Sequence, residues 1–233
     1  MNVRILQLTE GARMATGTTV IIDVFRAFSL EAYMLAAGAR EIYPIGDCEL
    51  ARKLKSENPE LVLAGERGGR ILPGFDTGNS PSELSKIDVF GKCVVHTTSA
   101  GTQGVANAIN AKEILGGSLV NARATAEYIR KSGAEDVSLV CMGLEAKEPT
   151  EEDTLCAEYI KMLLLGEDPD ISNEIADLKN TSGAKFFDSK NKDVFPTEDF
   201  FMCTELNKFD FAIKIKRTET GINISTKENV FYE

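Results

Sequence analysis

Polar and charged side chains gather in three segments of this sequence, each directly after an apolar run. Asp23 and Arg26 follow the first run, the loop at 64–81 follows the second, and the hydroxyl-rich turn "HTTSAGT" at 96–102 follows the third. Carboxylates hold hard cations such as Mg2+, whereas guanidinium groups hold phosphate or sulfonate through paired hydrogen bonds. The three segments therefore indicate one site that binds a cation and an anion.

The loop at 64–81, "AGERGGRILPGFDTGNSP", contains five glycines, two prolines, two arginines and two carboxylates among its eighteen residues. Ordered loops longer than about 12–15 residues are uncommon in compact domains and are usually functional sites or linkers. A linker would lack apolar side chains, but this loop has Leu72 and Phe75. We therefore expect it to present its charged side chains to a ligand: Glu66, Arg67, Arg70 and Asp76.

The turn at 96–102 carries hydroxyl groups where a strand is expected to pass into a helix. Its polar residues surround Gly101 and are Thr97, Thr98, Ser99 and Thr102. Such a turn presents unpaired N–H groups and the positive end of a helix, both of which favour an oxyanion. Ser, Thr and Asp are also common helix caps, so each of these residues, and Asp23, alone fits a structural role. The convergence of three strand ends is what favours a site.

Two further candidates lie in "TEEDTLC" at 150–156. Asp153 fits a capping box at the start of a helix, and Cys156, three residues later, lies on the same helix face. A buried and inert thiol is the expected state of such a cysteine. His96 is the only histidine, which excludes multi-histidine metal sites and favours a role as a strand residue.

Several common phosphate-handling motifs are missing from the sequence. It has no Cys-x5-Arg loop and no Asp-x-Asp pair after a strand. It also has neither the P-loop pattern nor the dinucleotide-binding glycine pattern. Oxygen ligands and arginines therefore remain as the groups that could handle a metal and an anion.

The composition indicates a globular protein, since 43% of its 233 residues are hydrophobic. A net charge of −10 disfavours unspecific binding to nucleic acid or to an anionic membrane. The five cysteines are widely spaced and form no Cys-x-x-Cys pair, so free thiols are expected. The apolar runs are too short for a membrane span, and the first residues do not resemble a secretory signal, so we expect a cytoplasmic protein.

Apolar strands alternate with helices from Thr18 to about Leu165. The expected strands occupy 18–24, 41–45, 60–65, 92–98, 111–117 and 136–142, and the expected helices about 30–37, 47–57, 101–110, 122–132 and 151–165. This order predicts an α/β fold, a three-layer α/β/α sandwich with a mostly parallel or mixed sheet. Such sheets bind ligands at the carboxyl ends of their strands. Residues 1–233 are expected to form a single α/β domain.

Residues 166–233 depart from this pattern and are expected to form a C-terminal appendage or smaller lobe. The segment "EDPDISNEIADLKNTSG" predicts a polar helix that ends at Gly183. The alternating segment "FDFAIKIKRTETGINIS" predicts a β-hairpin around "TETG".

Four sets of segments carry a resemblance to a known family. They are "VIIDVFRAFS", "LAGERGGRILPGFDTGNSP", "VVHTTSAGT" with "GSLVNARA", and "VCMG" with "EEDTLCAEYI". Their order and spacing resemble the 2-phosphosulfolactate phosphatase (ComB) family over about residues 18–160, and the segment after Gly166 resembles it only weakly. His96 departs from the family, where an apolar residue is expected. The resemblance implies an α/β/α fold and a Mg2+-dependent phosphatase that hydrolyses 2-phosphosulfolactate to 3-sulfolactate and phosphate, a step toward coenzyme M.

The resemblance also implies roles for individual residues. The carboxylates implied as metal ligands are Asp23, Glu66, Asp76 and Asp153. The residues implied for catalysis are Asp23, Glu66, Asp76 and Cys156. The residues implied for binding the phosphate, sulfonate and carboxylate groups of the substrate are Arg26, Arg67, Gly68, Gly69, Arg70, Asn79, Ser80, Thr97, Thr98, Ser99, Gly101, Thr102, Asn121 and Arg123.

Three nucleophiles are compatible with these residues. They are, in order of preference, water activated by the metal or by a carboxylate, Asp23 as a phospho-aspartate, and Cys156. Two other functions stay open: a phosphatase of the same fold acting on another small phosphorylated acid, and a sensor that binds an anionic metabolite without turnover. The expected partner is a small anionic substrate, with no nucleic acid and no membrane, and a homodimer is the assembly considered.

Overall fold

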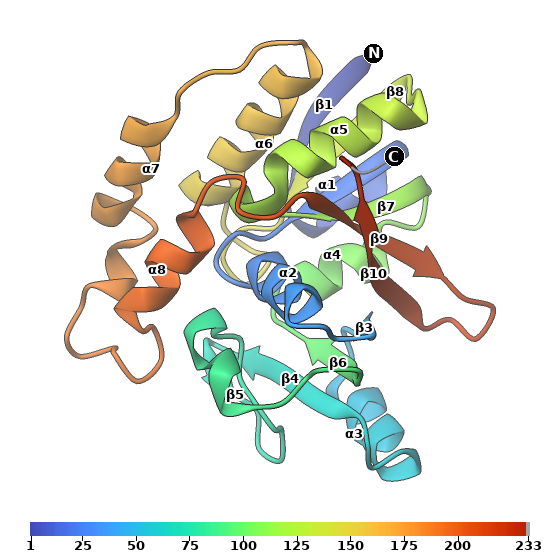
Figure 1. Ribbon diagram of the computed structural model, residues 1–233, viewed down its shortest axis with the longest axis vertical. Helices are drawn as coiled ribbons and strands as arrows, with labels where there is room; N and C mark the ends of the chain where they lie inside the picture. The colour runs from blue at the N-terminus through green and yellow to red at the C-terminus, as the bar shows by residue number, and fades with distance from the viewer. Residues whose placement is uncertain (232–233) are drawn as a thin grey trace.

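The computed structural model describes residues 1–231, which form one mixed sheet with helices on both of its faces (Figure 1). In spatial order the strands are β1 (Asn2–Gln7), β8 (Asp136–Cys141), β2 (Gly17–Ile22), β7 (Ala111–Gly117), β9 (Phe211–Arg217), β10 (Asn223–Asn229), β3 (Glu41–Pro44), β6 (Cys93–Thr97), β4 (Val62–Arg67) and β5 (Arg70–Ile71). The predicted fold class is confirmed.

The helices connect these strands as the sequence predicts and add shorter turns. The α-helices are α1 (Leu8–Met14), α2 (Ala27–Ala36), α3 (Cys48–Glu57), α4 (Gly101–Asn107), α5 (Ala122–Ser132), α6 (Glu151–Leu164), α7 (Ser172–Asp177) and α8 (Thr197–Thr204). The 3-10 helices are η1 (Pro81–Lys86), η2 (Leu119–Asn121), η3 (Leu178–Asn180) and η4 (Ala184–Phe186).

Three antiparallel pairings divide the sheet into two parallel groups. The strands β1, β8, β2 and β7 are parallel to one another, and so are β3, β6 and β4. Because the pairs β7–β9, β9–β10 and β10–β3 are all antiparallel, the two groups run in opposite senses along the ladder. Adjacent strands twist by about 20–25°, so the five steps from β2 to β6 rotate the second group by roughly 100–125°. This rotation turns the carboxyl ends of β4 and β6 toward that of β2.

The two faces of the sheet are covered by different helices. Side chains alternate along β2, so Ile21 packs in a cluster with residues of α1, α2 and α4, whereas Val20 and Ile22 pack with residues of α5 and α6. A third cluster places α3 against β4 and β6. These clusters form the layers of the predicted sandwich.

Helix α2 is buried on almost every side. Eight of its ten residues are buried, including Glu31, so it does not behave as an amphipathic surface helix. It lies against the sheet on one side and against η1 and α8 on the other. The polar side chains of α2 must therefore find partners inside the protein.

The C-terminal segment contains the predicted hairpin and a shorter helix than predicted. Strands β9 and β10 flank a turn in which the Gly221 N–H donates to the carbonyl of Thr218 at 3.0 Å. The hairpin occupies the middle of the sheet, between β7 and β3 (Figure 1). The predicted helix up to Gly183 is wrong in extent, because α7 ends at Asp177 and only short 3-10 turns follow it. Residues 180–182, "NTS", are weak helix formers.

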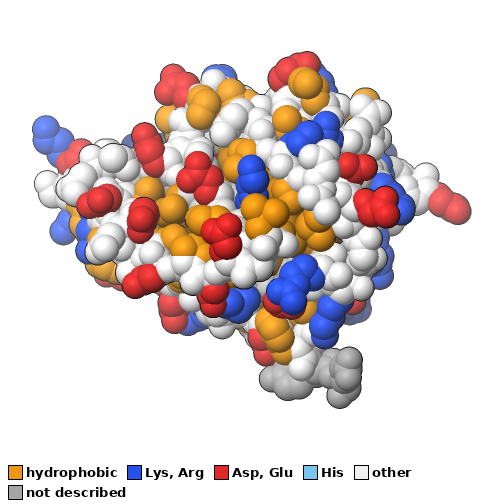
Figure 2. Space-filling model, turned by 90° about the horizontal axis from the view of Figure 1, so that it is seen from above, with side chains coloured by type: hydrophobic (Ala, Val, Ile, Leu, Met, Phe, Trp, Pro, Cys, Tyr) orange, Lys and Arg blue, Asp and Glu red, His pale blue; other side chains and the backbone are white. Residues whose placement is uncertain are grey.

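Charges of both signs are interspersed on the face shown in Figure 2. Asp and Glu side chains lie among Lys and Arg side chains and around apolar groups on the described part of this face. Within residues 1–231, no helix combines the length and the apolar character that a membrane crossing requires.

Candidate active site

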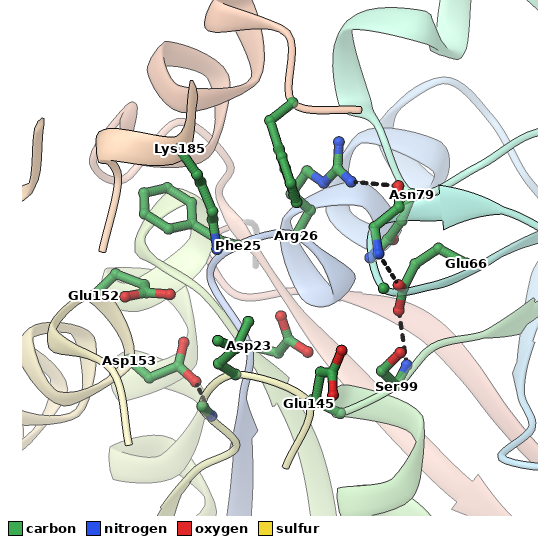
Figure 3. A pocket seen from close by; sticks show the side chains of 16 residues that line it. Asp23, Phe25, Arg26, Glu66, Asn79, Ser99, Glu145, Glu152, Asp153 and Lys185 are labelled. Carbon is green, nitrogen blue, oxygen red and sulfur yellow. Dashed lines mark hydrogen bonds between the residues drawn. The ribbon is translucent and has the colours of Figure 1, made fainter. Parts of the chain in front are cut away.

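A pocket of about 140 Å³ lies where the segments that follow β2, β4, β6 and β8 meet (Figure 3). Its charged lining residues are Asp23, Arg26, Glu66, Glu145, Glu152, Asp153 and Lys185. Five carboxylates and two cations thus line the pocket, which gives it a formal charge of −3. The pocket is therefore strongly acidic, although Arg26 and Lys185 also line it.

Asp23 connects the end of β2 to two helices. Its Oδ1 accepts a hydrogen bond from the Ala27 N–H at 3.1 Å, and its Oδ2 accepts one from the Gly101 N–H at 2.8 Å. A Cβ at position 101 would lie 3.0 Å from Asp23 Oδ2 and 2.8 Å from the Ala27 Cβ, so glycine is needed for this approach. Asp23 therefore caps α2 and joins it to α4.

Glu66 holds two loops together at the end of β4. Its Oε1 accepts from the Ser99 N–H at 2.8 Å, and its Oε2 accepts from the Gly69 N–H at 2.7 Å. Gly69 has a φ of +77°, and a Cβ there would lie 2.7 Å from the Phe195 ring. The glycines of the loop at 64–81 therefore let its backbone approach both a carboxylate and an aromatic side chain.

Asp153 makes the same kind of contact from the first turn of α6. Its Oδ1 accepts from the Val24 N–H at 2.8 Å, and its Oδ2 accepts from the Gly143 N–H at 2.8 Å. The neighbouring Glu152 is 3% exposed, and its Oε2 has no hydrogen-bond partner in the described part of the chain. The pocket thus contains one buried carboxylate oxygen whose partner must come from outside the protein.

The crowding of carboxylates changes their proton affinity. Burial, followed by the charge of Glu66 and then that of Glu152, raises the pKa of Asp23 to about 6, although two backbone N–H groups oppose the change. Burial and the charges of Glu152 and Asp23 also raise the pKa of Asp153 well above its ordinary value. Each carboxylate is therefore destabilised by its neighbours unless a cation or a proton joins them.

Arg26 lines the pocket but is already paired. Its Nη1 donates to Asp199 Oδ2 at 2.8 Å and to the Val194 carbonyl at 2.9 Å, and its Nη2 donates to the Gly69 carbonyl at 3.2 Å. The arginine is 3% exposed and Asp199 is fully buried. Arg26 therefore joins the C-terminal segment to the loop at 64–81 and has little charge to offer a ligand.

Lys185 is the second cation of the pocket and comes from η4. It lies over the rings of Phe25 and Phe195, both with 5.5 Å from Nζ to the ring centroid. No ion pair joins it to any carboxylate among residues 1–231, and its side chain points into the pocket in Figure 3. Lys185 therefore offers a positive charge that forms no ion pair within the described residues.

The sequence predicts about half of the lining. The predicted site residues that line the pocket are Asp23, Arg26, Glu66, Gly68, Gly69, Asn79, Ser99 and Asp153. The lining residues that the sequence did not indicate are Phe25, Ala100, Gly143, Leu144, Glu145, Glu152, Lys185 and Phe195. Of these, Phe25, Ala100, Gly143 and Glu152 lie in the segments that carry the family resemblance, whereas no pattern in the sequence indicated the other four.

Four predicted residues of the long loop and its continuation lie elsewhere. Asp76 faces away from the pocket, where its Oδ2 accepts from the Leu63 N–H at 2.8 Å and pairs with Lys55 at 3.2 Å. Arg67 is half-buried and donates to the Gly46 carbonyl and to Thr97, each at 3.2 Å. Ser80 donates to Asp199, and Arg70 is exposed on β5. Asp76, Arg67 and Ser80 bond to other parts of the protein and Arg70 lies on the surface, so none of the four lines the pocket with Asp23.

Three predicted residues from later in the chain are also separate from the pocket. Arg123 pairs with Asp168 at 2.7 Å on the surface. Asn121, directly before α5, is buried and donates a hydrogen bond to the Gly116 carbonyl. Cys156 is fully buried in the cluster under α5 and α6, and burial raises the pKa of its thiol well above the ordinary value. Cys156 is therefore not placed to act as a nucleophile.

The hydroxyl-rich turn does not offer the free N–H groups that the sequence suggests. The N–H groups of Ser99 and Gly101 donate to Glu66 and Asp23, as described above. Thr98 and Thr102 bond each other, with each hydroxyl accepting from the other's N–H at 3.0 and 3.2 Å. Carboxylates of the protein occupy the positions where an oxyanion was expected, because they satisfy the same donors.

No ready-made metal cage is present in the described chain. Among residues 1–231, no three His, Cys, Asp or Glu side chains come close enough together to hold a metal ion by themselves. Mg2+ is usually bound by only one or two carboxylates, with waters and substrate phosphates completing its coordination. The acidic pocket therefore has the donors for such a shared site, although not for a closed one.

The fold and this pocket define a mixed α/β protein with an acid-lined pocket at the ends of its parallel strands. A family model described as 2-phosphosulpholactate phosphatase matches residues 4–218, so the chain belongs to that family. The family is one of phosphoric monoester hydrolases, and the resemblance seen in the sequence is confirmed.

Individual relatives support the same family. A probable 2-phosphosulfolactate phosphatase of Bacillus subtilis is 34% identical over 201 residues, which are 85% of this chain and 86% of the relative. A protein of the same description from Caldanaerobacter subterraneus is 33% identical over 211 residues, 84% and 87% of the two chains. A third, from Caldicellulosiruptor saccharolyticus, is 43% identical over 156 residues, and this match spans 65% of the present chain and 64% of the relative's length.

Proposed function

We propose that the protein is a Mg2+-dependent phosphatase that hydrolyses 2-phosphosulfolactate to 3-sulfolactate and phosphate, a reaction of the kind that leads to coenzyme M. Membership of the family supports the reaction class and the substrate. The observation that carries the metal requirement is the pocket's set of five carboxylates against two cations. A substrate with phosphate, sulfonate and carboxylate groups would be repelled by such a pocket unless a divalent cation neutralised it.

The carboxylates of the pocket fit Mg2+. Glu152 has a buried oxygen without a partner, and the pKa values of Asp23 and Asp153 are raised partly by neighbouring negative charge. One or two of these carboxylates would hold the ion, and waters and substrate oxygens would complete its coordination, because no three of them lie close enough together to bind it alone. When bound, Mg2+ supplies charge neutralisation at the phosphate oxygens.

The other lining residues bind and enclose the substrate. Lys185, the unpaired cation, pairs with the sulfonate, because a sulfonate cannot be held by the acidic side chains opposite. Phe25 and Phe195 support Lys185 and exclude water from one wall. Gly69 is held by Glu66, so this carboxylate orders the backbone that borders the phosphate.

Water is the proposed nucleophile, with a pocket carboxylate as its proton acceptor. Cys156 lies in the core, away from the pocket. Both oxygens of Asp23 accept backbone hydrogen bonds, which stabilise the carboxylate and lower its reactivity toward phosphorus. These contacts favour hydrolysis by water over a phospho-aspartate.

The test is phosphate release from racemic 2-phosphosulfolactate in MgCl2 and in EDTA, with phosphoglycolate and 2-phosphoglycerate in parallel. We expect release from the sulfonate compound that EDTA abolishes. Asp153→Asn should lower kcat by about 100-fold or more, whereas Asp76→Asn, a matched change outside the pocket, should leave kcat near the wild-type value.

Other outcomes would change the proposal. Release from the other two acids but not from the sulfonate compound would assign a different phosphorylated acid. Binding of all three without release in Mg2+ would indicate a sensor. Equal losses in Asp153→Asn and Asp76→Asn would contradict the placement of the site.

Location and assembly also remain proposals. We propose a cytoplasmic location, which is supported by the five cysteines, none of which forms a disulfide. A homodimer stays a prediction that light scattering of the purified protein would test.

A further inference from the structure

Asn79, His96 and Glu31 form a chain of hydrogen bonds that runs from the wall of the pocket to the buried helix α2. His96 Nδ1 lies 2.9 Å from Glu31 Oε1, and His96 Nε2 lies 3.1 Å from Asn79 Oδ1. Glu31 and His96 are fully buried, and Asn79 is 6% exposed. Glu31 and His96 do not line the pocket, whereas Asn79 does, so Asn79 is the member of this chain that can contact a ligand.

The contacts of this chain fix its protons. The amide oxygen of Asn79 can only accept a hydrogen bond, so His96 Nε2 must carry a proton. His96 Nδ1 then either donates to an ionised Glu31 or accepts from a protonated one. In both states the buried pair has no net charge.

The opposite orientation of the Asn79 amide is costly. It would require an unprotonated His96 Nε2, so Nδ1 would carry the proton of a neutral ring. Glu31 would then be either ionised without a cation at a fully buried position or protonated at Oε2, where the proton has no acceptor among residues 1–231. A buried unpaired charge is strongly unfavourable, so Glu31 and His96 select the orientation in which the amide oxygen points to the histidine.

In this orientation the amide nitrogen of Asn79 points away from His96. Asn79 lines the pocket and lies near Arg26 and Glu66 in Figure 3. No group in the described chain accepts a hydrogen bond from its Nδ2. We propose that Asn79 donates this hydrogen bond to an oxygen of the anionic ligand, and that His96 and Glu31 are positioning residues that fix the amide. The proposal rests on the proposed function only in taking the ligand to carry an oxyanion.

The first test uses His96 as a single probe, since it is the only histidine of the chain. Nitrogen-15 NMR of protein labelled in histidine should show a protonated Nε2 near neutral pH. Inorganic phosphate, added together with MgCl2, should shift the imidazole resonances, because it engages the neighbouring amide. An unprotonated Nε2 would overturn the proposal, and so would resonances that do not move when calorimetry shows phosphate bound.

The second test separates positioning from structural support. Asn79→Ala should weaken phosphate binding, measured by calorimetry, by about tenfold, which corresponds to about 1.4 kcal/mol. The double variant Glu31→Met and His96→Met replaces the buried pair with apolar groups, so its melting temperature should stay close to the wild-type value. Its affinity for phosphate should fall toward that of Asn79→Ala. Glu31→Gln should retain wild-type affinity, because its amide can donate to Nδ1 and leave the proton on Nε2.

The outcomes distinguish this proposal from the proposed function. If 2-phosphosulfolactate is not hydrolysed but phosphate binding depends on Asn79 and on the buried pair, the function fails and the positioning chain stands. If hydrolysis occurs and all variants bind phosphate like the wild type, only the positioning chain is overturned. A double variant that keeps both its melting temperature and its phosphate affinity would also overturn it.

Discussion

Removal of the Asp199 carboxylate should destabilise this protein far more than removal of a surface carboxylate. Asp199 is fully buried and accepts hydrogen bonds from Arg26 at 2.8 Å, from Ser80 at 2.9 Å and from the Ser82 N–H at 2.9 Å. Asp199→Ala leaves the guanidinium of Arg26, which is 3% exposed, without its counter-charge. The remaining partners of Arg26 are two backbone carbonyls, which carry no charge.

The size of the effect follows from this burial. Removing one partner of a buried ion pair costs about 3–5 kcal/mol. In a chain of 150–250 residues each kcal/mol lowers the melting temperature by about 2–4 °C, so we expect a fall of roughly 6–20 °C. Thermal unfolding followed by circular dichroism, with urea unfolding as a second measure, would determine it.

Two controls make the test specific. Asp168→Ala breaks the exposed pair with Arg123 and should leave the melting temperature close to the wild-type value. The double variant Arg26→Met and Asp199→Leu removes both charges and should recover most of the stability. The reasoning is refuted if the melting temperatures of Asp199→Ala and Asp168→Ala lie within about 2 °C of each other, because a buried unpaired guanidinium should lower the stability by more than that.

The pocket and the cysteines provide three more tests. Lys185→Met should raise KM for the sulfonate substrate about tenfold with little change in kcat. Lys179, whose ammonium lies over the exposed ring of Phe201, is the control, and Lys179→Met should leave KM unchanged. Equal changes in KM would contradict the role assigned to Lys185. Gly101→Ala would place a Cβ 2.8 Å from a side chain of α2, so we expect a lower melting temperature and lower activity, and wild-type values of both would show that the packing is wrong. An aromatic disulfide reagent should modify partly exposed Cys48 in the native protein but Cys156 only after unfolding, since burial raises the pKa of the Cys156 thiol; rapid native labelling of both would refute this.

The order of strands and helices could be predicted because it follows from the spacing of apolar residues within each segment. The predicted strands and helices between Thr18 and Leu165 reappear in the structure in the same order, with boundaries that differ by up to three residues. Asp23 and Glu66 could be placed near each other because both follow strands, and the ends of β2 and β4 do meet. The short strand β1 and the helix α1 after it were not predicted, although they form the sheet edge and part of one layer.

The remaining parts of the site depend on contacts between distant segments. Lys185 reaches the pocket only because Asp199 and Arg26 anchor the C-terminal segment across 173 residues of sequence, and nothing around Lys185 indicates this. Asp76 was predicted to bind the metal because it is an acidic residue of the long loop. In the structure the loop folds back, and the Asp76 carboxylate accepts a hydrogen bond from the Leu63 N–H instead. Spacing shows which groups lie close in the chain, whereas hydrogen-bond competition decides which of them stay free.

The central position of the C-terminal hairpin has a consequence for folding during translation. Strands β9 and β10 leave the ribosome after the other eight described strands, yet they join β7 to β3 and hold the two halves of the sheet together. Until residues 211–229 emerge, both β7 and β3 have an unpaired edge, and such edges readily pair with other chains. Nascent chains that lack residues 211–229 should therefore depend on chaperones, whereas a chain that contains these residues has the hairpin available from the start when it is diluted from urea.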